Sequence, residues 1–349
     1  MTPTLRLRGP ADMIAVLPYH LGYRPTDSLV LVCLDGPRVT LVGRVDLPPP
    51  DVPPSRVLDE LLPHVLAERP DRVLLIGYAD EAVAAVADRV SAAVRDALAR
   101  EQVAVLDRLL VRSGRWWSLD CAGSCCPAEG TPVPADEDVP AVADYVLLGR
   151  RPATSRAALD ERLAPLDRGP DASSRAEQLR TDVTGAIDRG GPTLDAARTE
   201  ALRLWGRALD ITQEPPDGDW ARLAASLLDV HLRDLVIAWI CPGTLELDAV
   251  DPALAGRARS ALPALAADPD AAVSDQDSLV DRLAALCRRS PVELSPGPLC
   301  VLASFTWWRG DGALTRVALE RTLEVDPGYR LAGLLLRMVD LAIRPRRAA

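Results

Sequence analysis

The 349-residue sequence predicts an α/β domain with a mixed sheet over residues 1–150, followed by an all-α domain over residues 151–349. Three observations support this. Short apolar runs rich in β-branched residues are confined to the first domain. Two of these runs flank an alanine-rich stretch with helical spacing, which is the pattern of a strand–helix–strand crossover between parallel strands. After Pro140, apolar residues recur every three or four positions, and no strand-like alternation interrupts them.

The first elements follow from local patterns. Asp12–Leu21 has the apolar spacing of a helix. Ser28–Leu34 and Arg38–Leu47 are rich in β-branched residues and surround a glycine-containing turn, which predicts a β-hairpin. Ser55–Glu68 is predicted to be a helix. Ser55 is its expected N-cap, because a serine side chain accepts hydrogen bonds from the first free N–H groups of a helix.

The crossover comes next. Val73–Tyr78 is a continuous apolar run, which is typical of a strand buried on both faces. Ala79–Arg100 is rich in alanine and has helical spacing, and Val103–Arg112 returns to a strand pattern. The sheet is therefore expected to combine this parallel pair with the antiparallel hairpin.

The second domain is predicted to consist of antiparallel helix pairs. Breakers such as Pro215-Pro216, Pro242-Gly243 and Pro291 separate several of the helices. The expected helices span residues 140–148, 155–165, 172–190, 193–209, 219–241, 252–267, 275–289, 297–309, 311–325 and 329–343.

The C-terminal region, near residues 301–343, resembles the second half of one tetratricopeptide repeat. Gly310-Asp311 marks the turn, and the small side chains of Ala313 and Ala318 allow close helix packing. Stable arrays need about three repeats, and one clear unit is present. Two interpretations remain open: a helical hairpin that packs on its own domain, or a groove that binds a peptide.

Two absences exclude whole classes of chemistry. All 40 basic residues are arginine, and the sequence contains neither lysine nor asparagine. Without lysine there is no Schiff-base nucleophile and no lysine of a phosphate-binding P-loop. Kinase-type phosphoryl transfer needs both missing residue types. With three histidines, a histidine-rich metal site is not expected either, and no cofactor is predicted.

Charge and hydropathy limit the partners and the location. A net charge of −10 argues against a general nucleic-acid binder, which neutralises phosphates with basic side chains. Neither a secretion signal nor an apolar stretch of membrane-spanning length is visible. Seven cysteines without a secretion signal fit a reducing compartment. We therefore expect a cytoplasmic protein that binds neither nucleic acid nor membrane.

Several sequence blocks together resemble one family. In the first block the matching residues are Pro18, Tyr19, Leu21, Gly22, Tyr23, Arg24, Pro25, Asp27, Ser28, Leu29 and Val30. The other blocks are Arg44–Pro48, Arg115–Ser118, Cys125–Pro127, Trp308–Ala313 and Asp326–Tyr329. Over nearly its whole length the chain is similar to the actinobacterial domain-of-unknown-function 4192 family. The resemblance implies an actinobacterial origin, which the arginine-rich, lysine-free composition also fits. It implies no particular activity.

The segment that leads into the first strand contains the first candidate site. Its simplest interpretation is a turn held by an arginine–aspartate pair. The alternative is a polar pocket at the sheet edge, because arginine recognises carboxylate and phosphate through two parallel hydrogen bonds. The candidate ligand-binding residues are Tyr19, Arg24, Asp27, Ser28, Arg44 and Asp46.

The second candidate site is the loop that contains Trp116, Trp117, Cys121, Cys125 and Cys126. Adjacent tryptophans on a strand point to opposite faces, so one would be buried and the other would line a surface. Three cysteines are one ligand short of a structural zinc site, so no metal is predicted, although these cysteines are the candidate ligands. A redox pair would need an electropositive setting. The simplest interpretation is a loop whose thiols pack against the tryptophans.

A third place of interest lies in the helical domain. His231 and Asp234 are neighbours one helical turn apart, which is an arrangement found when a carboxylate orients a general base. No companion nucleophile can be identified. The alternative is a polar stripe or an ion pair between helices.

Three functions remain open. The first is a non-catalytic binding or scaffolding protein whose helical domain contacts a protein partner. The second is a hydrolase or transferase that acts on an anionic small molecule at the cluster of candidate ligand-binding residues. The third is a thiol or metal switch at the cysteine loop. The lack of a recognisable catalytic constellation favours the first.

Overall fold

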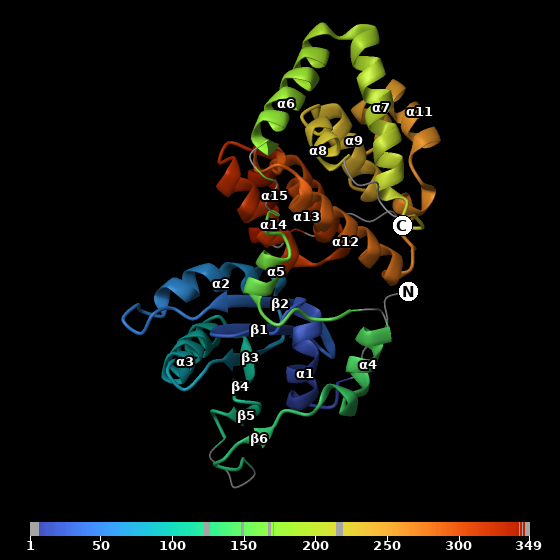
Figure 1. The fold of residues 1–349 in the computed structure, drawn as a ribbon. Helices are drawn as coiled ribbons and strands as arrows, with labels where there is room; N and C mark the ends of the chain where they lie inside the picture. The colour runs from blue at the N-terminus through green and yellow to red at the C-terminus, as the bar shows by residue number, and fades with distance from the viewer. Residues whose placement is uncertain are drawn as a thin grey trace. The chain divides into compact units, whose positions relative to one another are not determined.

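The computed structural model describes residues 7–121, 126–147, 150–166, 169, 171–213, 219–341, 343 and 345. The chain forms two compact units, Met1–Ser155 and Arg156–Ala349 (Figure 1). The sequence places this boundary at residue 150. A six-stranded sheet with helices makes up the first unit, and helices make up the described part of the second. The predicted order of a mixed α/β part followed by a helical part is therefore confirmed.

The first unit contains the whole sheet. Its elements are α1 (Pro10–Leu21), β1 (Ser28–Asp35), β2 (Arg38–Asp46), α2 (Ser55–Glu68), β3 (Arg72–Tyr78), α3 (Ala84–Arg100), β4 (Ala104–Arg112), β5 (Arg115–Ser118), β6 (Thr131–Pro132), η1 (Asp136–Asp138) and α4 (Pro140–Leu147). The strand order is β2-β1-β3-β4-β5-β6. β3 and β4 are parallel and flank α3, whereas the other neighbouring pairs are antiparallel. Both the predicted crossover and the predicted hairpin are present.

Helix α2 has the predicted bounds but not the predicted cap. Pro54 occupies the N-cap position with φ −59° and ψ −20°, and no side chain caps the helix. Because proline already fixes φ near the helical value, the helical backbone begins one residue too early for Ser55 to act as the cap.

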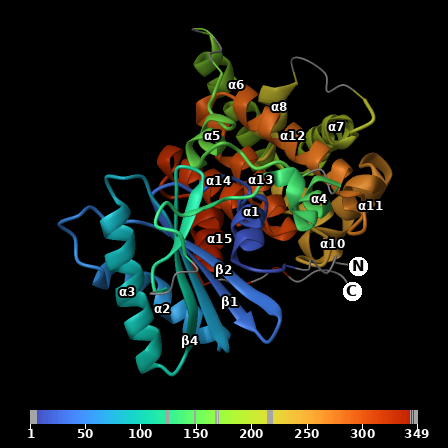
Figure 2. The same ribbon diagram turned by 90° about the horizontal axis from the view of Figure 1, so that it is seen from below.

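Helices cover both faces of the sheet (Figures 1 and 2). On one face, Leu29 and Leu31 of β1 pack in a core with α2 and α3. On the other face, Val30 of β1 and Ile76 of β3 pack against Leu17 of α1. Alternate residues of a strand point to opposite faces, so the continuous apolar runs of β1 and β3 fit strands that are buried on both sides.

The end of α1 determines how the chain enters the sheet. Gly22 ends the helix with φ 81°, a conformation that glycine adopts without a steric penalty. The Arg24 N–H then donates to the Ala153 carbonyl at 2.9 Å, and the Ala153 N–H donates to the Gly22 carbonyl at 2.8 Å. Asp27 also has a positive φ of 41°, which aspartate tolerates better than most residues. These constraints direct the chain into β1 at Ser28.

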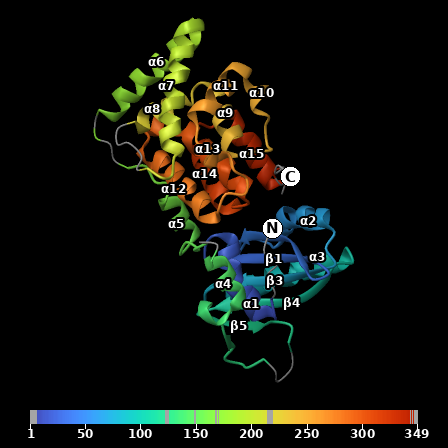
Figure 3. The same ribbon diagram turned by 90° about the vertical axis from the view of Figure 1, so that its right-hand side faces the viewer.

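The described part of the second unit is helical. Its elements are α5 (Arg156–Glu161), α6 (Ala172–Arg189), α7 (Gly191–Leu209), α8 (Trp220–Ser226), α9 (Val230–Ile240), α10 (Leu247–Val250), α11 (Pro252–Ala261), η2 (Ala264–Ala267), α12 (Val273–Arg289), η3 (Val292–Leu294), α13 (Pro296–Arg309), α14 (Gly312–Val325) and α15 (Arg330–Asp340). Consecutive helices such as α13 and α14 pack against each other, whereas α6 and α7 join at one end and diverge from there (Figures 1 and 3). Among the described helices, none is both long and apolar enough to cross a membrane.

The single helix predicted over residues 219–241 is wrong. The structure has two helices, α8 and α9, with a turn at residues 227–229 between them. The Asp229 carboxylate accepts hydrogen bonds from the N–H groups of His231 and Leu232 and so starts a new helix. An N-cap stabilises a helix by about 1 kcal/mol. The spacing of apolar residues gives no sign of such a cap, so it predicts one continuous helix.

Arg198 of α7 joins the N-termini of two other helices in the second unit. Its Nε lies 2.7 Å from the Asp229 carboxylate, and its Nη1 lies 3.0 Å from the Asp251 carboxylate. Asp251 caps α11 through the Leu254 N–H. Each carboxylate therefore caps a helix and neutralises the buried guanidinium, which leaves the charges of this triad well paired.

The C-terminal hairpin has its turn at Gly310-Asp311. Gly310 is left-handed with φ 86°, and the Asp311 carboxylate caps α14 through the Leu314 N–H. The hydroxyls of Thr306 in α13 and Thr315 in α14 lie 2.9 Å apart in the buried contact between the two helices. The likeness of this hairpin to a tetratricopeptide repeat stays a prediction.

Candidate functional site

One row of residues crosses the sheet at the carboxyl ends of the parallel strands. Tyr78, the last residue of β3, lies opposite Ser28 of β1 on one side and Val111 of β4 on the other. The row extends to Asp46 of β2 and Trp116 of β5. Residues directly opposite one another project from the same face, and here it is the face covered by α1. Open α/β sheets bind ligands beyond the carboxyl ends of their parallel strands.

Several polar atoms of this face are buried without a hydrogen-bond partner among the described residues. They are Ser28 Oγ, the Tyr78 hydroxyl, Trp116 Nε1 and Arg44 Nε. Arg44 lies on β2 two residues before Asp46, so its side chain projects from the same face. These are four of the six such atoms in the described chain. Buried polar groups nearly always have partners, and an orphan costs about 1–3 kcal/mol. Their concentration marks this face of the sheet as the candidate site.

A cleft of about 390 Å³ opens beside Tyr78. Its walls come from α1, from the turn before β1, from β4 and from the segment between β6 and α4. The apolar wall includes Ile14, Ala15, Pro18, Val111 and Val133, and the polar groups are Arg24, Tyr78 and Asp136. This volume is within the roughly 300–1,000 Å³ range of small-molecule pockets. Burial raises the pKa of Tyr78 above its ordinary value, so its hydroxyl stays protonated.

Asp136 organises the polar wall of the cleft. The Tyr19 hydroxyl donates to Asp136 Oδ2 at 2.8 Å, and Arg24 Nη2 donates to the same oxygen at 3.1 Å. Tyr19 is buried, whereas the Arg24 and Asp136 side chains are 54% and 39% exposed. Burial, followed by the hydrogen bond to Asp136, raises the pKa of Tyr19. The Asp136 carboxylate therefore accepts one hydrogen bond from a buried, protonated tyrosine and one from a partly exposed arginine.

Tyr145 of α4 packs against Tyr19. The two ring centroids are 6.0 Å apart, and the Tyr145 hydroxyl lies 3.3 Å from His20 Nδ1. The guanidinium carbon of Arg150 lies 5.8 Å from the Tyr145 ring centroid. Because α1 and α4 pack together here, the position of Tyr19 is determined by helix packing as well as by Asp136.

Arg44 and Asp46 form a second, separate ion pair on β2. Their side chains are joined at 2.5 Å from Arg44 Nη2 to Asp46 Oδ1. Arg44 is mostly buried, and its guanidinium carbon lies 5.9 Å from the centroid of the Tyr23 ring. This pair belongs to the same face as the row of Ser28 and Tyr78.

The six predicted ligand-binding residues thus have different positions. Arg24 lines the cleft, and Tyr19 holds the Asp136 carboxylate of its wall. Ser28 is buried beside Tyr78, and Arg44 and Asp46 pair with each other. Asp27 has an exposed side chain, and its carbonyl accepts a hydrogen bond from the Leu47 N–H at 2.9 Å. The carboxylate partner of Arg24 is Asp136 rather than the nearby Asp27.

The two tryptophans of the cysteine loop point to opposite faces of the sheet. Trp116 packs with the core under α1. Trp117 lies on the other face, where Nε1 donates to the Ala128 carbonyl at 3.1 Å and the guanidinium carbon of Arg112 is 5.0 Å from the ring centroid. A Cβ at Gly130 would lie 2.4 Å from the Trp117 ring. The end of the loop is therefore closely packed.

Two of the three loop cysteines, Cys121 and Cys126, are half-buried, and Cys125 lies outside the described residues. Within the described ranges, no group of three or more His, Cys, Asp or Glu side chains is arranged to hold a metal ion. The thiol or metal switch therefore stays a hypothesis.

The polar residues at the start of α9 form contacts other than the one considered from the sequence. Arg233 Nε donates to Asp234 at 2.9 Å, and Arg233 Nη1 donates to the Tyr329 hydroxyl at 3.3 Å. His231 is exposed in the first turn of the helix. The alternative of a polar contact between helices therefore describes this place better than a base oriented by Asp234.

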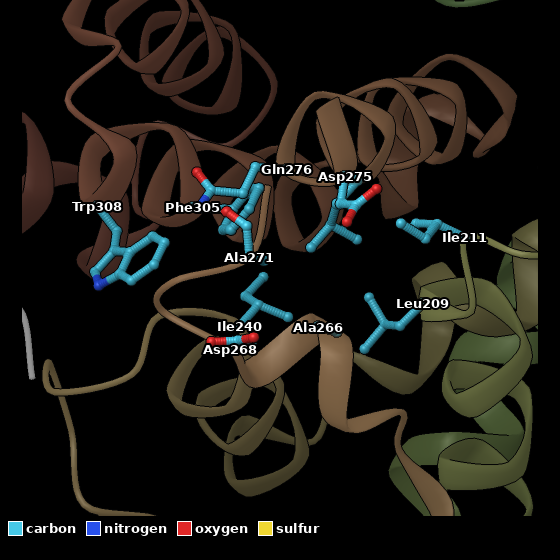
Figure 4. A pocket seen from close by; sticks show the side chains of 11 residues that line it. Leu209, Ile211, Ile240, Ala266, Asp268, Ala271, Asp275, Gln276, Phe305 and Trp308 are labelled. Atoms are coloured by element: carbon cyan, nitrogen blue, oxygen red, sulfur yellow. Dashed lines mark hydrogen bonds between the residues drawn. The ribbon is translucent and has the colours of Figure 1, made fainter. Parts of the chain in front are cut away.

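The helical unit has a second hollow, which is too small for a ligand (Figure 4). Its volume is about 10 Å³, roughly the space of one water molecule. Apolar side chains such as Leu209, Ile240 and Phe305 line it together with the polar side chains of Asp268, Asp275 and Gln276. It is a packing defect between helices.

Two polar residues of the cleft, Tyr78 and Asp136, are absent from the predicted set. Tyr78 ends an apolar run, which predicts a core residue. Its place at the carboxyl end of a predicted parallel strand could still have indicated a site residue. Asp136 belongs to the acidic run Asp136–Asp138, which reads as a solvated loop. Its position more than a hundred residues from Tyr19 and Arg24 leaves no local signal.

Fold and cleft together define a two-unit protein, in which an α/β unit with a polar cleft precedes a helical unit. Residues 10–346 match the family model described as domain of unknown function (DUF4192). The chain therefore belongs to this family. No curated protein and no solved structure matches the chain.

Proposed function

We propose that this chain is a non-catalytic binding protein whose α/β unit holds a small molecule in the cleft beside Tyr78. One observation carries the proposal. The Tyr78 hydroxyl is buried, belongs to a residue that lines a cleft of about 390 Å³, and has no hydrogen-bond partner among the described residues. A ligand that pairs with this hydroxyl would offset a cost of about 1–3 kcal/mol.

The contacts of the site favour binding over catalysis. A catalytic serine is activated by an adjacent base, but Ser28 Oγ has no hydrogen-bond partner in the part of the chain that the structure describes. Arg24 and Arg44 each have a carboxylate at 3.1 and 2.5 Å. Neither is therefore an unneutralised cation of the kind that would bind an anionic substrate with two parallel hydrogen bonds.

Ligand-observed NMR with a library of small neutral and charged fragments tests this function on the full chain. We expect a subset to bind the wild type and to lose at least fivefold in affinity with Tyr78→Phe, because one hydrogen bond to the ligand is lost. Tyr329→Phe is the matched control, since it removes the same atom from the helical unit. If no fragment distinguishes wild type from Tyr78→Phe, the cleft is not a binding site.

The scaffolding part of the proposal concerns the helical unit. Leu334 of α15 and Leu341 just beyond it are 55% and 65% exposed, and residues seven apart lie on one face of a helix. We propose that this face and the tetratricopeptide-like hairpin bind an amphipathic helix of a cytoplasmic protein in an actinobacterium. Leu334→Glu with Leu341→Glu should abolish recovery of a partner in a pull-down, whereas Arg175→Glu, at an exposed position of α6 outside this face, should not. Equal recovery with both variants would exclude this surface.

A further inference from the structure

We infer that the cleft binds a neutral molecule through an amide-type group, in which an N–H donor lies beside a carbonyl acceptor. The inference rests on the binding function proposed above and specifies the chemistry of the ligand. Three features support it: an unused oxygen of Asp136, the charge balance of the cleft and the Tyr78 hydroxyl.

The first feature is the way in which Asp136 is held. Both Tyr19 and Arg24 donate to Oδ2, so Oδ1 accepts no hydrogen bond from the described residues. Arg24 is engaged through Nη2 and keeps further N–H donors in the exposed part of its guanidinium. The wall of the cleft therefore presents one acceptor and one donor side by side. An amide edge is complementary to such a pair, because it offers a donor next to an acceptor.

The second feature is charge. Arg24 and Asp136 neutralise each other at 3.1 Å, and Glu137 and Asp138 follow Asp136 in an acidic run. An anionic ligand would approach this run and would compete with Asp136 for Arg24. A cationic ligand would compete with Arg24 for Asp136. Either charge would be moved out of water against apolar walls without an unshared counter-ion, which is unfavourable. A neutral ligand avoids both costs.

The third feature is the buried hydroxyl of Tyr78, a residue that lines the cleft. Tyr78 is 7% exposed and lines the same cleft as Arg24 and Asp136. Since burial keeps this phenol protonated, it is a hydrogen-bond donor. A carbonyl oxygen can accept from Tyr78 and from Arg24 at once, because it has two lone pairs. The other lining residues, among them Ile14, Pro18 and Val133, have apolar side chains, which suit a hydrocarbon ring attached to the amide.

Two matched sets of compounds test the inference on the full chain by ligand-observed NMR. One set is benzamide, benzoate and benzylamine, and the other is cyclohexanecarboxamide, cyclohexanecarboxylate and cyclohexylmethylamine. Within each set the ring is the same and the polar group differs. We expect each amide to bind at least fivefold more tightly than its acid and its amine. N,N-dimethylbenzamide, which lacks the N–H, should bind wild type at least fivefold more weakly than benzamide.

Asp136→Asn gives a second, independent test. Tyr19 and Arg24 need an acceptor at the Oδ2 position, so the asparagine oxygen takes that place and its NH₂ group replaces Oδ1. The free acceptor thus becomes a donor, and benzamide should lose about tenfold in affinity while N,N-dimethylbenzamide changes less than twofold. If this variant does not fold, the comparison of the two benzamides on wild type still decides the matter.

The outcomes separate the two proposals. If an acid or an amine binds more tightly than its amide, and Tyr78→Phe weakens that binding, the cleft is a binding site but the amide inference is wrong. If benzamide and N,N-dimethylbenzamide bind equally, the role assigned to Asp136 Oδ1 is wrong. If none of these compounds binds the wild type, whereas other fragments bind and lose affinity with Tyr78→Phe, the amide inference is wrong and the proposed binding function stands. If no fragment of any kind distinguishes wild type from Tyr78→Phe, both fail.

Discussion

Ser28 and Tyr78 lie directly opposite one another on β1 and β3, yet neither hydroxyl has a hydrogen-bond partner among the described residues. They cannot satisfy each other, because the phenol ring carries the tyrosine hydroxyl far beyond the short serine side chain. Ser28 is fully buried and Tyr78 nearly so. The described part of the α/β unit therefore has unpaired polar groups at the carboxyl end of β3, a strand of its parallel pair.

Tyr78→Phe should leave the stability of the ligand-free protein unchanged or raise it by up to about 1 kcal/mol. The variant removes a buried hydroxyl that has no partner among the residues described, so no hydrogen bond to them is lost. Urea unfolding followed by circular dichroism measures the effect. Tyr19→Phe is the control and should lose about 1 kcal/mol, because that hydroxyl donates to Asp136. A loss above about 1 kcal/mol for Tyr78→Phe would mean that its hydroxyl is paired.

Gly130→Ala should destabilise the α/β unit by about 2–3 kcal/mol. Two effects add: Gly130 has φ +77°, and an added Cβ would lie 2.4 Å from the Trp117 ring. Gly114→Ala separates them, because Gly114 has a similar φ of +73° but nothing within 4 Å of an added Cβ. It should lose about 1–2 kcal/mol. Equal losses in urea unfolding would show that the Trp117 contact contributes nothing.

Arg198→Ala should destabilise the helical unit by about 3–5 kcal/mol. The guanidinium is buried between Asp229 and Asp251, and its removal leaves two carboxylates without their counter-ion. Arg203→Ala on the same helix is the control, since the exposed Arg203 pairs with Glu200 at the surface. Its removal should leave the thermal unfolding midpoint almost unchanged, because an exposed ion pair contributes little to stability. Similar losses for both variants would contradict the structural role of Arg198.

The stability of the helical unit should fall in acid, and Asp251 should account for part of that fall. The hydrogen bond from the Leu254 N–H lowers the pKa of Asp251, and Arg198 lowers it further. The ionised form therefore stabilises the folded state above the unfolded pKa of about 3.9, and this contribution is lost as the pH falls through the folded pKa.

Asp251→Asn measures this contribution. The difference in unfolding free energy between wild type and Asp251→Asn should be largest above pH 5 and should shrink toward pH 2. Urea unfolding at a series of pH values tests it, with the exposed Glu324→Gln as the control. A difference that stays constant across this range would contradict the proposed linkage.

Much of the α/β unit follows from residues close together in sequence. The hairpin of β1 and β2 and the crossover from β3 to β4 appear as predicted, because a strand buried on both faces needs a continuous apolar run and a crossover helix needs helical spacing. The short strand β6, with two residues, has no such pattern. Its pairing with β5 depends on how the loop after Trp117 returns.

In the helical unit, too, local patterns predict the helices, whereas contacts between distant residues determine where the helices begin and end. Apolar periodicity is continuous from α8 into α9, so it predicts one helix. The cap at Asp229, reinforced by Arg198 from a different helix, separates the two. Periodicity reports which side of a helix is buried, whereas the point at which a helix begins depends on individual hydrogen bonds.

The sequence by itself determined the order of the elements and the parallel pair within a mixed sheet. The tertiary structure decided which charges meet. Arg24 pairs with Asp136 rather than with Asp27, and Tyr78 rather than Asp27 lines the cleft. Strand and helix patterns arise from interactions between near neighbours in the chain. The cleft arises where the turn before β1, the end of β3 and the segment before α4 converge, and that convergence depends on packing between distant segments.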